Sequence, residues 1–139
     1  MTPLEDAKYR VKLAREHLED AIFEHDHGRW SKTALSAQLS VENSAKAVIS
    51  FFGPLSKTHD LAGTLLELRS SNMSEDQKKA MGRLSEITEK FGVKEHVLTS
   101  HGDEVALKTP REIYDQSKAK RALDMAQEAL DIASKMTGD

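Results

Sequence analysis

The amino-acid sequence predicts an all-α protein, an up-and-down bundle of four to five helices. Apolar residues recur three and four positions apart through most of the 139 residues, and no stretch shows the alternation that a half-buried strand requires. Ala, Leu, Glu and Lys are plentiful and aromatic residues make up only 5% of the chain, a composition that favours helices. This length suits one core, so we expect a single domain over residues 1–139.

Two long helices are predicted first. One covers residues 3–27 and ends at Gly28, and the next opens at Trp30 and stops at Gly53 and Pro54. Their short connection favours antiparallel neighbours. The first helix is expected to turn inward Leu4, Ala7, Val11, Ala14, Leu18, Ala21 and Ile22. The second is expected to turn inward Ala34, Ala37, Val41, Ala45, Val48, Ile49 and Phe52.

Two shorter helices are predicted in the middle of the chain. Thr58 is the expected N-cap of a third helix that reaches Leu68. Ser74 and Gln77 form a capping-box pattern ahead of a fourth helix, which runs to about Phe91. The inward positions of the fourth helix are predicted to be Met81, Leu84, Ile87 and Phe91.

The last helix has the clearest start signal. Thr109 is the expected N-cap, Pro110 occupies the first helical position and Glu112 completes a capping box, so one helix is predicted to run to about Met136. Its inward positions are expected at Ile113, Ala119, Leu123, Ala126, Leu130 and Ala133. Residues 99–109 lack periodicity and are predicted to be irregular, with a short helical piece before them at 93–98.

Charge and cysteine content exclude several classes of protein. The net charge is -3, and basic and acidic residues alternate without a polybasic tract, which lowers the expectation of nucleic-acid binding but leaves room for a local basic cleft. A chain without cysteine has no disulfide, thiolate metal site or thiol nucleophile. The N-terminus lacks a signal-peptide pattern, and no apolar run is long enough for a membrane span, so we expect a cytoplasmic protein.

A polar stripe crosses the second helix. Gln38, Glu42 and Lys46 are spaced four residues apart and therefore share one helix face. One interpretation is a solvated Glu–Lys pair, worth about 0.3 to 0.5 kcal/mol. The other is a polar seam at a cleft or a dimer interface.

The histidines do not form a recognisable metal motif. His25, Asp26 and His27 are consecutive on a helix, where side chains diverge by about 100°. His96 and His101 flank the irregular stretch and could gather around Asp103 and Glu104 for a metal or for acid–base work, although polar side chains of an ordinary surface loop are the favoured interpretation. A phosphate-binding glycine loop, a G-x-S-x-G elbow and an H-E-x-x-H pair are absent from the sequence, so we predict no metal and no cofactor.

The order of the motifs resembles the HEPN domain family (higher eukaryotes and prokaryotes nucleotide-binding). The resemblance rests on Gly28-Arg29-Trp30 opening a helix, the segment 41–47 reading VENSAKA, the segment 58–61 reading THDL, and a late Pro110 and Tyr114 before an alanine-rich helix. It covers nearly the whole chain. It implies a helical bundle that forms homodimers and, in many members, pairs with a nucleotidyltransferase as toxin and antitoxin.

Active ribonucleases of the family carry an R-x(4-6)-H motif late in the fold. The literal match here is Arg10 with His17, in the first predicted helix and therefore in the wrong place. Related small members have an Arg-Tyr-Pro-Asp-like turn before the final helix, whereas this chain has Ser100-His101-Gly102-Asp103-Glu104 and lacks the arginine. The resemblance still lets a group of side chains line a ligand or partner groove, namely His101, Asp103, Glu104, Arg111 and Tyr114.

Three functional hypotheses follow. The first is a non-catalytic homodimeric module that binds a nucleotide, RNA or a nucleotidyltransferase partner. The second is a metal-independent ribonuclease toxin that uses His101 or His96 with Arg111. The third is a structural dimer in which the polar stripe serves assembly only.

Overall fold

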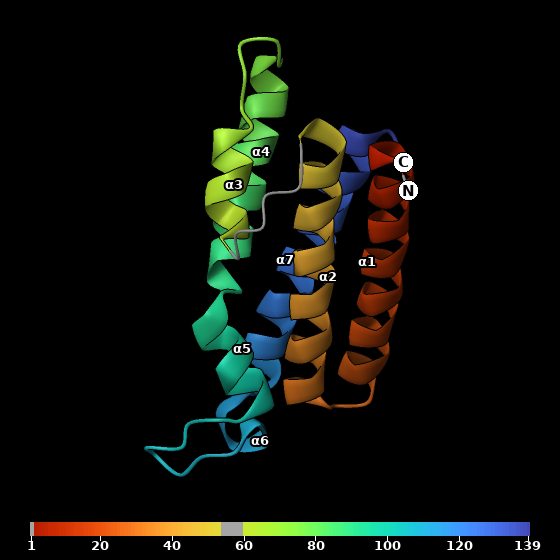
Figure 1. The fold of residues 1–139 in the computed structure, drawn as a ribbon. Coiled ribbons are helices and arrows are strands. Elements are labelled where there is room, and N and C mark those ends of the chain that lie inside the picture. The colour runs from red at the N-terminus through yellow and green to blue at the C-terminus, as the bar shows by residue number, and fades with distance from the viewer. Residues whose placement is uncertain (1, 54–59) are drawn as a thin grey trace.

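Three long helices form the main bundle, α1 (Pro3–Asp26), α2 (Trp30–Phe52) and α7 (Gln116–Thr137). The structure, a computed structural model, describes residues 2–53 and 60–139. In Figure 1, α1 and α2 run antiparallel and the start of α1 lies beside the end of α7. The predicted all-α, up-and-down architecture is confirmed.

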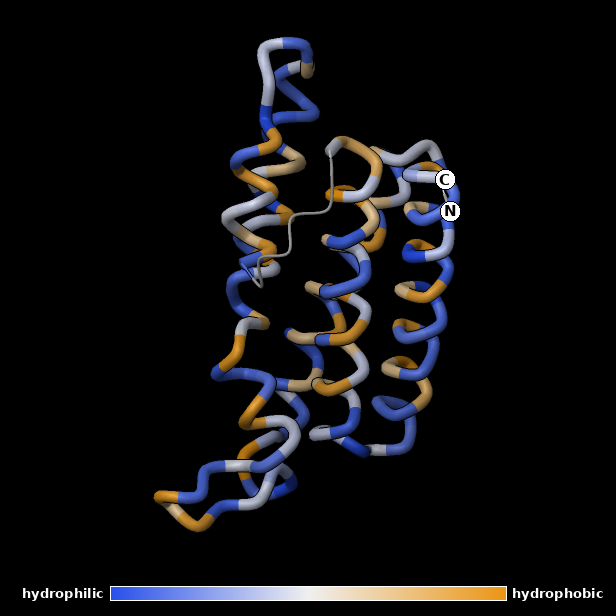
Figure 2. Tube along the Cα trace, in the orientation of Figure 1, coloured by the Kyte–Doolittle hydropathy of each residue, from blue (hydrophilic) through white to orange (hydrophobic). Residues whose placement is uncertain are grey.

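Small side chains let these helices approach closely. Alanines at intervals of seven lie along the buried face of α1, and α2 and α7 contribute further buried alanines. Such residues permit short interaxial distances, which explains a core with few aromatics. Figure 2 shows hydrophilic and hydrophobic residues alternating along each long helix, as expected of amphipathic helices.

Polar side chains fix the register between α1 and α2. The Ser40 hydroxyl donates to the Ala14 carbonyl oxygen across 2.8 Å in the buried interface. Ser50 also donates to the Asp6 carboxylate, and Arg10 Nη1 donates to Asn43 Oδ1 at 3.3 Å. Buried polar atoms need such partners, because an unpaired one costs about 1 to 3 kcal/mol.

A helical hairpin packs beside α2 and α7. It consists of α3 (Leu61–Glu67) and α4 (Glu75–Lys90), and its buried side chains include Leu65, Met81, Leu84 and Ile87. The capping box of Ser74 and Gln77 is formed, as predicted. The N-cap of α3 is Asp60, whose carboxylate accepts from the Gly63 amide at 2.9 Å, whereas the predicted cap Thr58 lies outside the described residues.

The C-terminal part departs from the prediction. The expected short helical piece is α5 (Val93–Ser100), and the capping box of Thr109 and Glu112 opens only a one-turn helix, α6 (Pro110–Ile113). Tyr114 then takes an extended conformation, and Asp115 caps α7 by accepting from the Lys118 amide at 2.8 Å. The single final helix predicted from Thr109 is therefore wrong, because a second N-cap six residues later restarts it.

Most predicted inward positions are buried, but α1 shows two errors. Leu4 and Ile22 are exposed, although the nearby Ala7 and Ala21 are fully buried, so these two side chains lie on the margin of the buried face. Seven helices occur over residues 2–53 and 60–139, whereas four to five were predicted. The difference comes from the two short helices α5 and α6. No helix within these ranges is both long and apolar enough to cross a membrane.

Candidate functional site

The predicted site residues lie in three separate hollows of the surface. Gln38 and Glu42 line one between α2, α3, α4 and α5. His101, Asp103 and Glu104 line a second beside α5. Arg111 and Tyr114 line a third at the start of α2, and Lys46 lines none of the three. The residues predicted from the sequence therefore do not form one site, because they are divided among three separate hollows.

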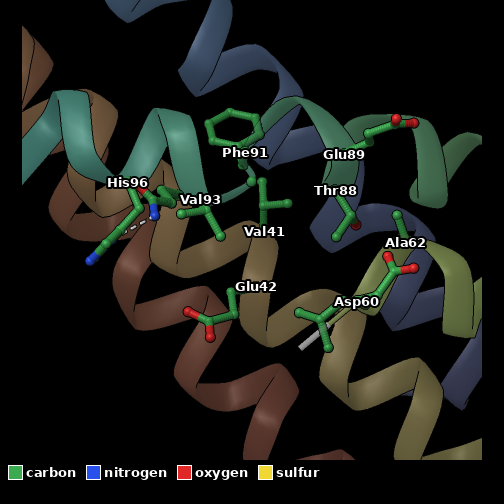
Figure 3. Close-up of a pocket in the computed structure, with 12 residues that line it drawn as sticks. Val41, Glu42, Asp60, Ala62, Thr88, Glu89, Phe91, Val93 and His96 are labelled. Carbon is green, nitrogen blue, oxygen red and sulfur yellow. Dashed lines mark hydrogen bonds between the residues drawn. The ribbon is translucent and has the colours of Figure 1, made fainter. Parts of the chain in front are cut away.

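The first hollow, here called the α2–α5 groove, has a volume of about 510 Å³. Figure 3 shows its apolar side chains, among them Val41, Phe91 and Val93, with Glu42 and Glu89 at its margins. Asp60 adds a third carboxylate. The described residues that line it include no lysine or arginine, so the groove combines an apolar floor with an acidic rim.

A buried hydrogen-bond network holds one end of this groove. Gln38 Nε2 lies 2.8 Å from His96 Nδ1, and the Thr99 hydroxyl donates to Gln38 Oε1 at 3.0 Å. Because an amide nitrogen can only donate, Nδ1 accepts and a neutral His96 carries its proton on Nε2. Gln38 thus joins α2 to α5, and this part of the polar stripe has a structural role in the packing of the two helices.

The remaining part of the stripe is a surface ion pair. Lys46 Nζ lies 3.0 Å from Glu42 Oε1, and both side chains are partly exposed. A pair of this kind contributes about 0.3 to 0.5 kcal/mol. The polar stripe predicted from the spacing therefore has two parts. Gln38 forms buried hydrogen bonds to α5, and Glu42 and Lys46 form a solvated ion pair.

The second hollow lies beside a hairpin formed by residues 103–108, which projects from the bundle between α5 and α6 (Figure 1). Asp103 and Lys108 close it through two backbone hydrogen bonds of 2.8 and 2.9 Å. The Asp103 carboxylate also accepts from the Ala106 amide at 3.0 Å. This carboxylate, predicted to line a ligand or partner groove, lies at the second hollow and also shapes the turn.

The third hollow, here called the cationic pocket, has a volume of about 380 Å³ and carries positive charge. Its lining is Gly28, Arg29, Trp30, Ser31, Lys32, Arg111 and Tyr114. Arg29 pairs with Glu24 at 3.3 Å, whereas the side chains of Lys32 and Arg111 form no ion pair or hydrogen bond with any other described residue. The described lining includes no carboxylate, so the pocket favours an anion.

The start of α2 strengthens this electrostatic preference. Its N-cap is Arg29, which supplies no side-chain hydrogen bond, and its first turn contains no acidic residue. The first amides of a helix lack intrahelical acceptors and carry a partial positive charge. At this end of a 23-residue helix they add to the field of the cationic side chains.

Tyr114 forms the wall of the pocket on the α6 side. It is buried, and its hydroxyl donates to Glu95 Oε1 at 2.5 Å. Burial, followed by this hydrogen bond, raises the pKa of Tyr114 well above its ordinary value. The phenol stays neutral at physiological pH and acts as a structural wall.

Sequence reasoning missed half of this pocket. In the sequence, Trp30 marks a helix start and Arg29 belongs to the family pattern, but neither of them nor Lys32 is among the predicted site residues. The available signal was a long helix whose start has a glycine, two cations and no capping side chain. Its connection to Arg111 could not be found in the sequence, because 79 positions separate Lys32 from Arg111.

The histidines are dispersed. His27 stacks on Phe23 and its Nδ1 lies 2.8 Å from the Phe23 carbonyl oxygen, whereas the His25 ring meets Trp30 edge-on. No group of three metal-ligating side chains occurs in the part of the chain that the structure describes. Arg10 is engaged between α1 and α2 through Asp6 and Asn43.

The three residues of the ribonuclease hypothesis do not share a hollow in one copy of the chain. His96 lines the α2–α5 groove, His101 lines the hollow beside the hairpin, and Arg111 lines the cationic pocket. A general base and a phosphate-binding arginine must reach the same phosphodiester. Their separation gives this hypothesis no geometric support within a single copy.

Comparisons with known proteins agree with this fold. The model of the HEPN domain matches residues 7–136. A crystal structure of TT1696 from Thermus thermophilus is 22% identical, covers 94% of this chain and 97% of its own, and superposes with a TM-score of 0.69. ST0689, an archaeal HEPN homologue, is 18% identical with the same coverages and a TM-score of 0.63. A search of curated proteins gives no significant match.

Proposed function

Because this chain belongs to the HEPN domain family, we propose that it is a non-catalytic module whose cationic pocket binds the phosphate group of a nucleotide or of RNA. The observation that carries this proposal is the meeting of Lys32, Arg111 and the uncapped start of α2 around one hollow. Arg and Lys side chains together with helix-terminal amides are the groups that proteins commonly use for phosphate.

The aromatic residue in the pocket supports a nucleotide over a bare anion. Trp30 lines the same hollow as the two unpaired cations. An aromatic ring next to a phosphate site can stack on a base, a contact worth about 1 to 3 kcal/mol that tolerates any sequence. The pocket therefore suits a single unpaired nucleotide or a single-stranded segment.

The chemistry of the pocket favours binding without cleavage. Metal-independent RNA cleavage needs a base that removes the proton of the 2′-hydroxyl group. None of the described lining residues is a histidine, and Tyr114 is neutral and tied to Glu95. We therefore assign the pocket to recognition and retain the ribonuclease only as a test outcome.

We further propose that the module works as a cytoplasmic homodimer and that a nucleotidyltransferase is its protein partner. Both ideas come from the family and were expected from the sequence motifs. A nucleotide-binding module beside an enzyme that transfers nucleotides would hold the substrate or the modified product. This division of labour requires no catalytic residue in the present chain.

The direct test uses the chain's one tryptophan, which lies in the proposed site. Titration with adenosine monophosphate and with single-stranded RNA should quench Trp30 emission, and inorganic sulfate should compete. A parallel gel assay with and without EDTA reads retardation and cleavage of the same RNA. Retardation of intact RNA supports the proposal. Cleavage that survives EDTA and is lost in His101→Ala would establish the ribonuclease instead, and absence of both quenching and retardation would refute nucleotide binding.

A further inference from the structure

The α2–α5 groove presents apolar surface to solvent. Val93 belongs to its lining and is 80% exposed, and Figure 3 shows Val41 and Phe91 beside it. The groove volume of about 510 Å³ lies within the range of about 300 to 1,000 Å³ that is typical of small-molecule sites. Covering such a floor is favourable, because it removes apolar surface from water. The groove therefore has the size and the floor of a site for a small organic molecule.

The margin of the groove carries negative charge. Glu42, Asp60 and Glu89 line it from three different segments, and the described lining includes no lysine or arginine. Lys46 pairs with Glu42 at 3.0 Å from outside the lining and so balances one of these carboxylates. The Glu89 side chain forms no ion pair or hydrogen bond with any other described residue. The electrostatic field at the margin therefore favours a cation.

The polar side chains of the groove offer a ligand acceptors more than donors. The Thr88 hydroxyl already donates to the Leu84 carbonyl oxygen at 2.7 Å. The Gln38 amide is engaged by both His96 and Thr99. The donors that are left on these lining side chains are neutral, namely His96 Nε2 and the second amide hydrogen of the buried Gln38. A ligand therefore meets carboxylate oxygens as the charged groups, and a charged N–H group satisfies these best.

We propose that the α2–α5 groove binds a small organic cation, a molecule with an apolar body of one or two rings and an ammonium or amidinium group. The apolar body would cover Val41, Phe91 and Val93. The cationic group would lie at the margin, near Glu89. Figure 3 shows Glu89 beside the apolar floor and on a different helix from Glu42, so the margin offers carboxylates on more than one side.

This site is separate from the one in the proposed function. The groove and the cationic pocket share no lining residue among those described, and their charges are opposite. A phosphate compound that suits the cationic pocket is repelled by the carboxylates of the groove. The chain would thus bind two classes of ligand, an anion at the start of α2 and a cation between α2 and α5.

Three probes that share one aromatic ring test the preference for a cation: phenethylamine, phenethyl alcohol and phenylacetate. In NMR spectra of protein labelled at valine methyl groups, phenethylamine should shift Val41 and Val93 saturably, with a Kd of about a millimolar for a molecule of this size. The neutral alcohol should bind more weakly, and phenylacetate should leave these signals unchanged. Adenosine monophosphate should also leave them unchanged while it quenches Trp30, so failure of the groove and failure of the nucleotide site give different results.

A substitution at the margin tests the role of charge. Glu89→Gln should weaken phenethylamine binding about threefold, as expected for one partly exposed charge pair, and should not alter binding of the alcohol. Glu86→Gln is the matched control, since Glu86 is an exposed residue of the same helix outside the groove lining, and it should change neither affinity.

Two results would overturn the proposal for a cation. One is equal binding of the three probes, and the other is an affinity for phenethylamine that Glu89→Gln leaves intact. A lysine-rich amphipathic peptide is titrated separately. Shifts of Val41 and Val93 with this peptide and none with phenethylamine would assign the groove to a protein partner and would refute a small-molecule site. No shift of these two residues with any of the probes would refute it as well.

Discussion

Tyr114 donates its phenol hydrogen to Glu95 across 2.5 Å and thereby joins the extended segment before α7 to α5. The bond has two consequences. It fixes the wall of the cationic pocket, and it holds α5 against the segment that precedes α7. The site proposed to bind a nucleotide therefore depends on a contact with α5.

The first prediction concerns alkaline pH. The pKa of Tyr114 is raised in the folded state above its ordinary value of 10.0, so unfolding releases a proton once the pH exceeds that value. Stability should be fully present below pH 10 and should fall as the pH rises further, by at most about 1.4 kcal/mol per pH unit. Urea unfolding from pH 8 to 11 should show a weaker decline in Tyr114→Phe. The exposed Tyr9 is the control, and Tyr9→Phe should follow the unmodified protein.

The second prediction concerns the ion pair between α4 and α7. Arg83 Nε and Nη2 donate to the two carboxylate oxygens of Glu128 at 2.7 and 2.9 Å. Both side chains are more than a third exposed, so Glu128→Gln should cost no more than about 1 kcal/mol. The hydrogen bond from Arg83 lowers the pKa of Glu128, so this contribution exists above pH 4.5 and disappears as the pH falls through the folded-state pKa. A cost that is equal at pH 7 and pH 3 would contradict this interpretation of the pair, and the exposed Glu75→Gln serves as control.

The third prediction concerns Gly102, at the base of the hairpin. Its φ is +74°, and an added Cβ would lie 2.2 Å from the Lys108 carbonyl oxygen. Gly102→Ala should therefore open the hairpin and accelerate proteolysis between residues 103 and 108. Gly138 has a similar φ of +76° with no atom within 4 Å of an added Cβ. Gly138→Ala isolates the backbone strain, about 1 kcal/mol, from the clash. Equal protease resistance of the two variants would contradict this prediction, because it would mean that the chain accommodates a Cβ at position 102 next to the Lys108 carbonyl oxygen.

The fourth prediction concerns Gln38. Replacing it with alanine removes the partner of His96 Nδ1 and leaves a small void between α2 and α5. The expected loss is about 1 to 3 kcal/mol of unfolding free energy. Hydrogen exchange should become faster in α5 before the main bundle is affected. Gln127→Ala, which removes an exposed bond to Asp131, should change neither measurement.

The fold could be predicted because its signals are local. The spacing of Ala7, Ala14 and Ala21 and the capping box of Ser74 and Gln77 depend on neighbours within one or two turns. The break at Tyr114 could not be predicted, since its extended backbone is held by Glu95 from another helix. The same limit applies to the site. Arg111 was predicted as a ligand contact, but its neighbours Trp30 and Lys32 come from a distant segment that only the packing of α6 against α2 brings close.

A phosphate site at the start of α2 is best tested by the affinity for a short single-stranded RNA as a function of salt concentration. Two variants remove the same charge, Lys32→Ala/Arg111→Ala in the cationic pocket and Arg69→Ala/Lys79→Ala on the α3–α4 hairpin at the opposite end (Figure 1). The pocket variant should bind at least tenfold more weakly and should reduce the slope of log affinity against log salt by about one to two. The Arg69→Ala/Lys79→Ala variant should match the unmodified protein in affinity and in slope. Equal affinities and slopes for all three proteins would contradict a phosphate site in the cationic pocket.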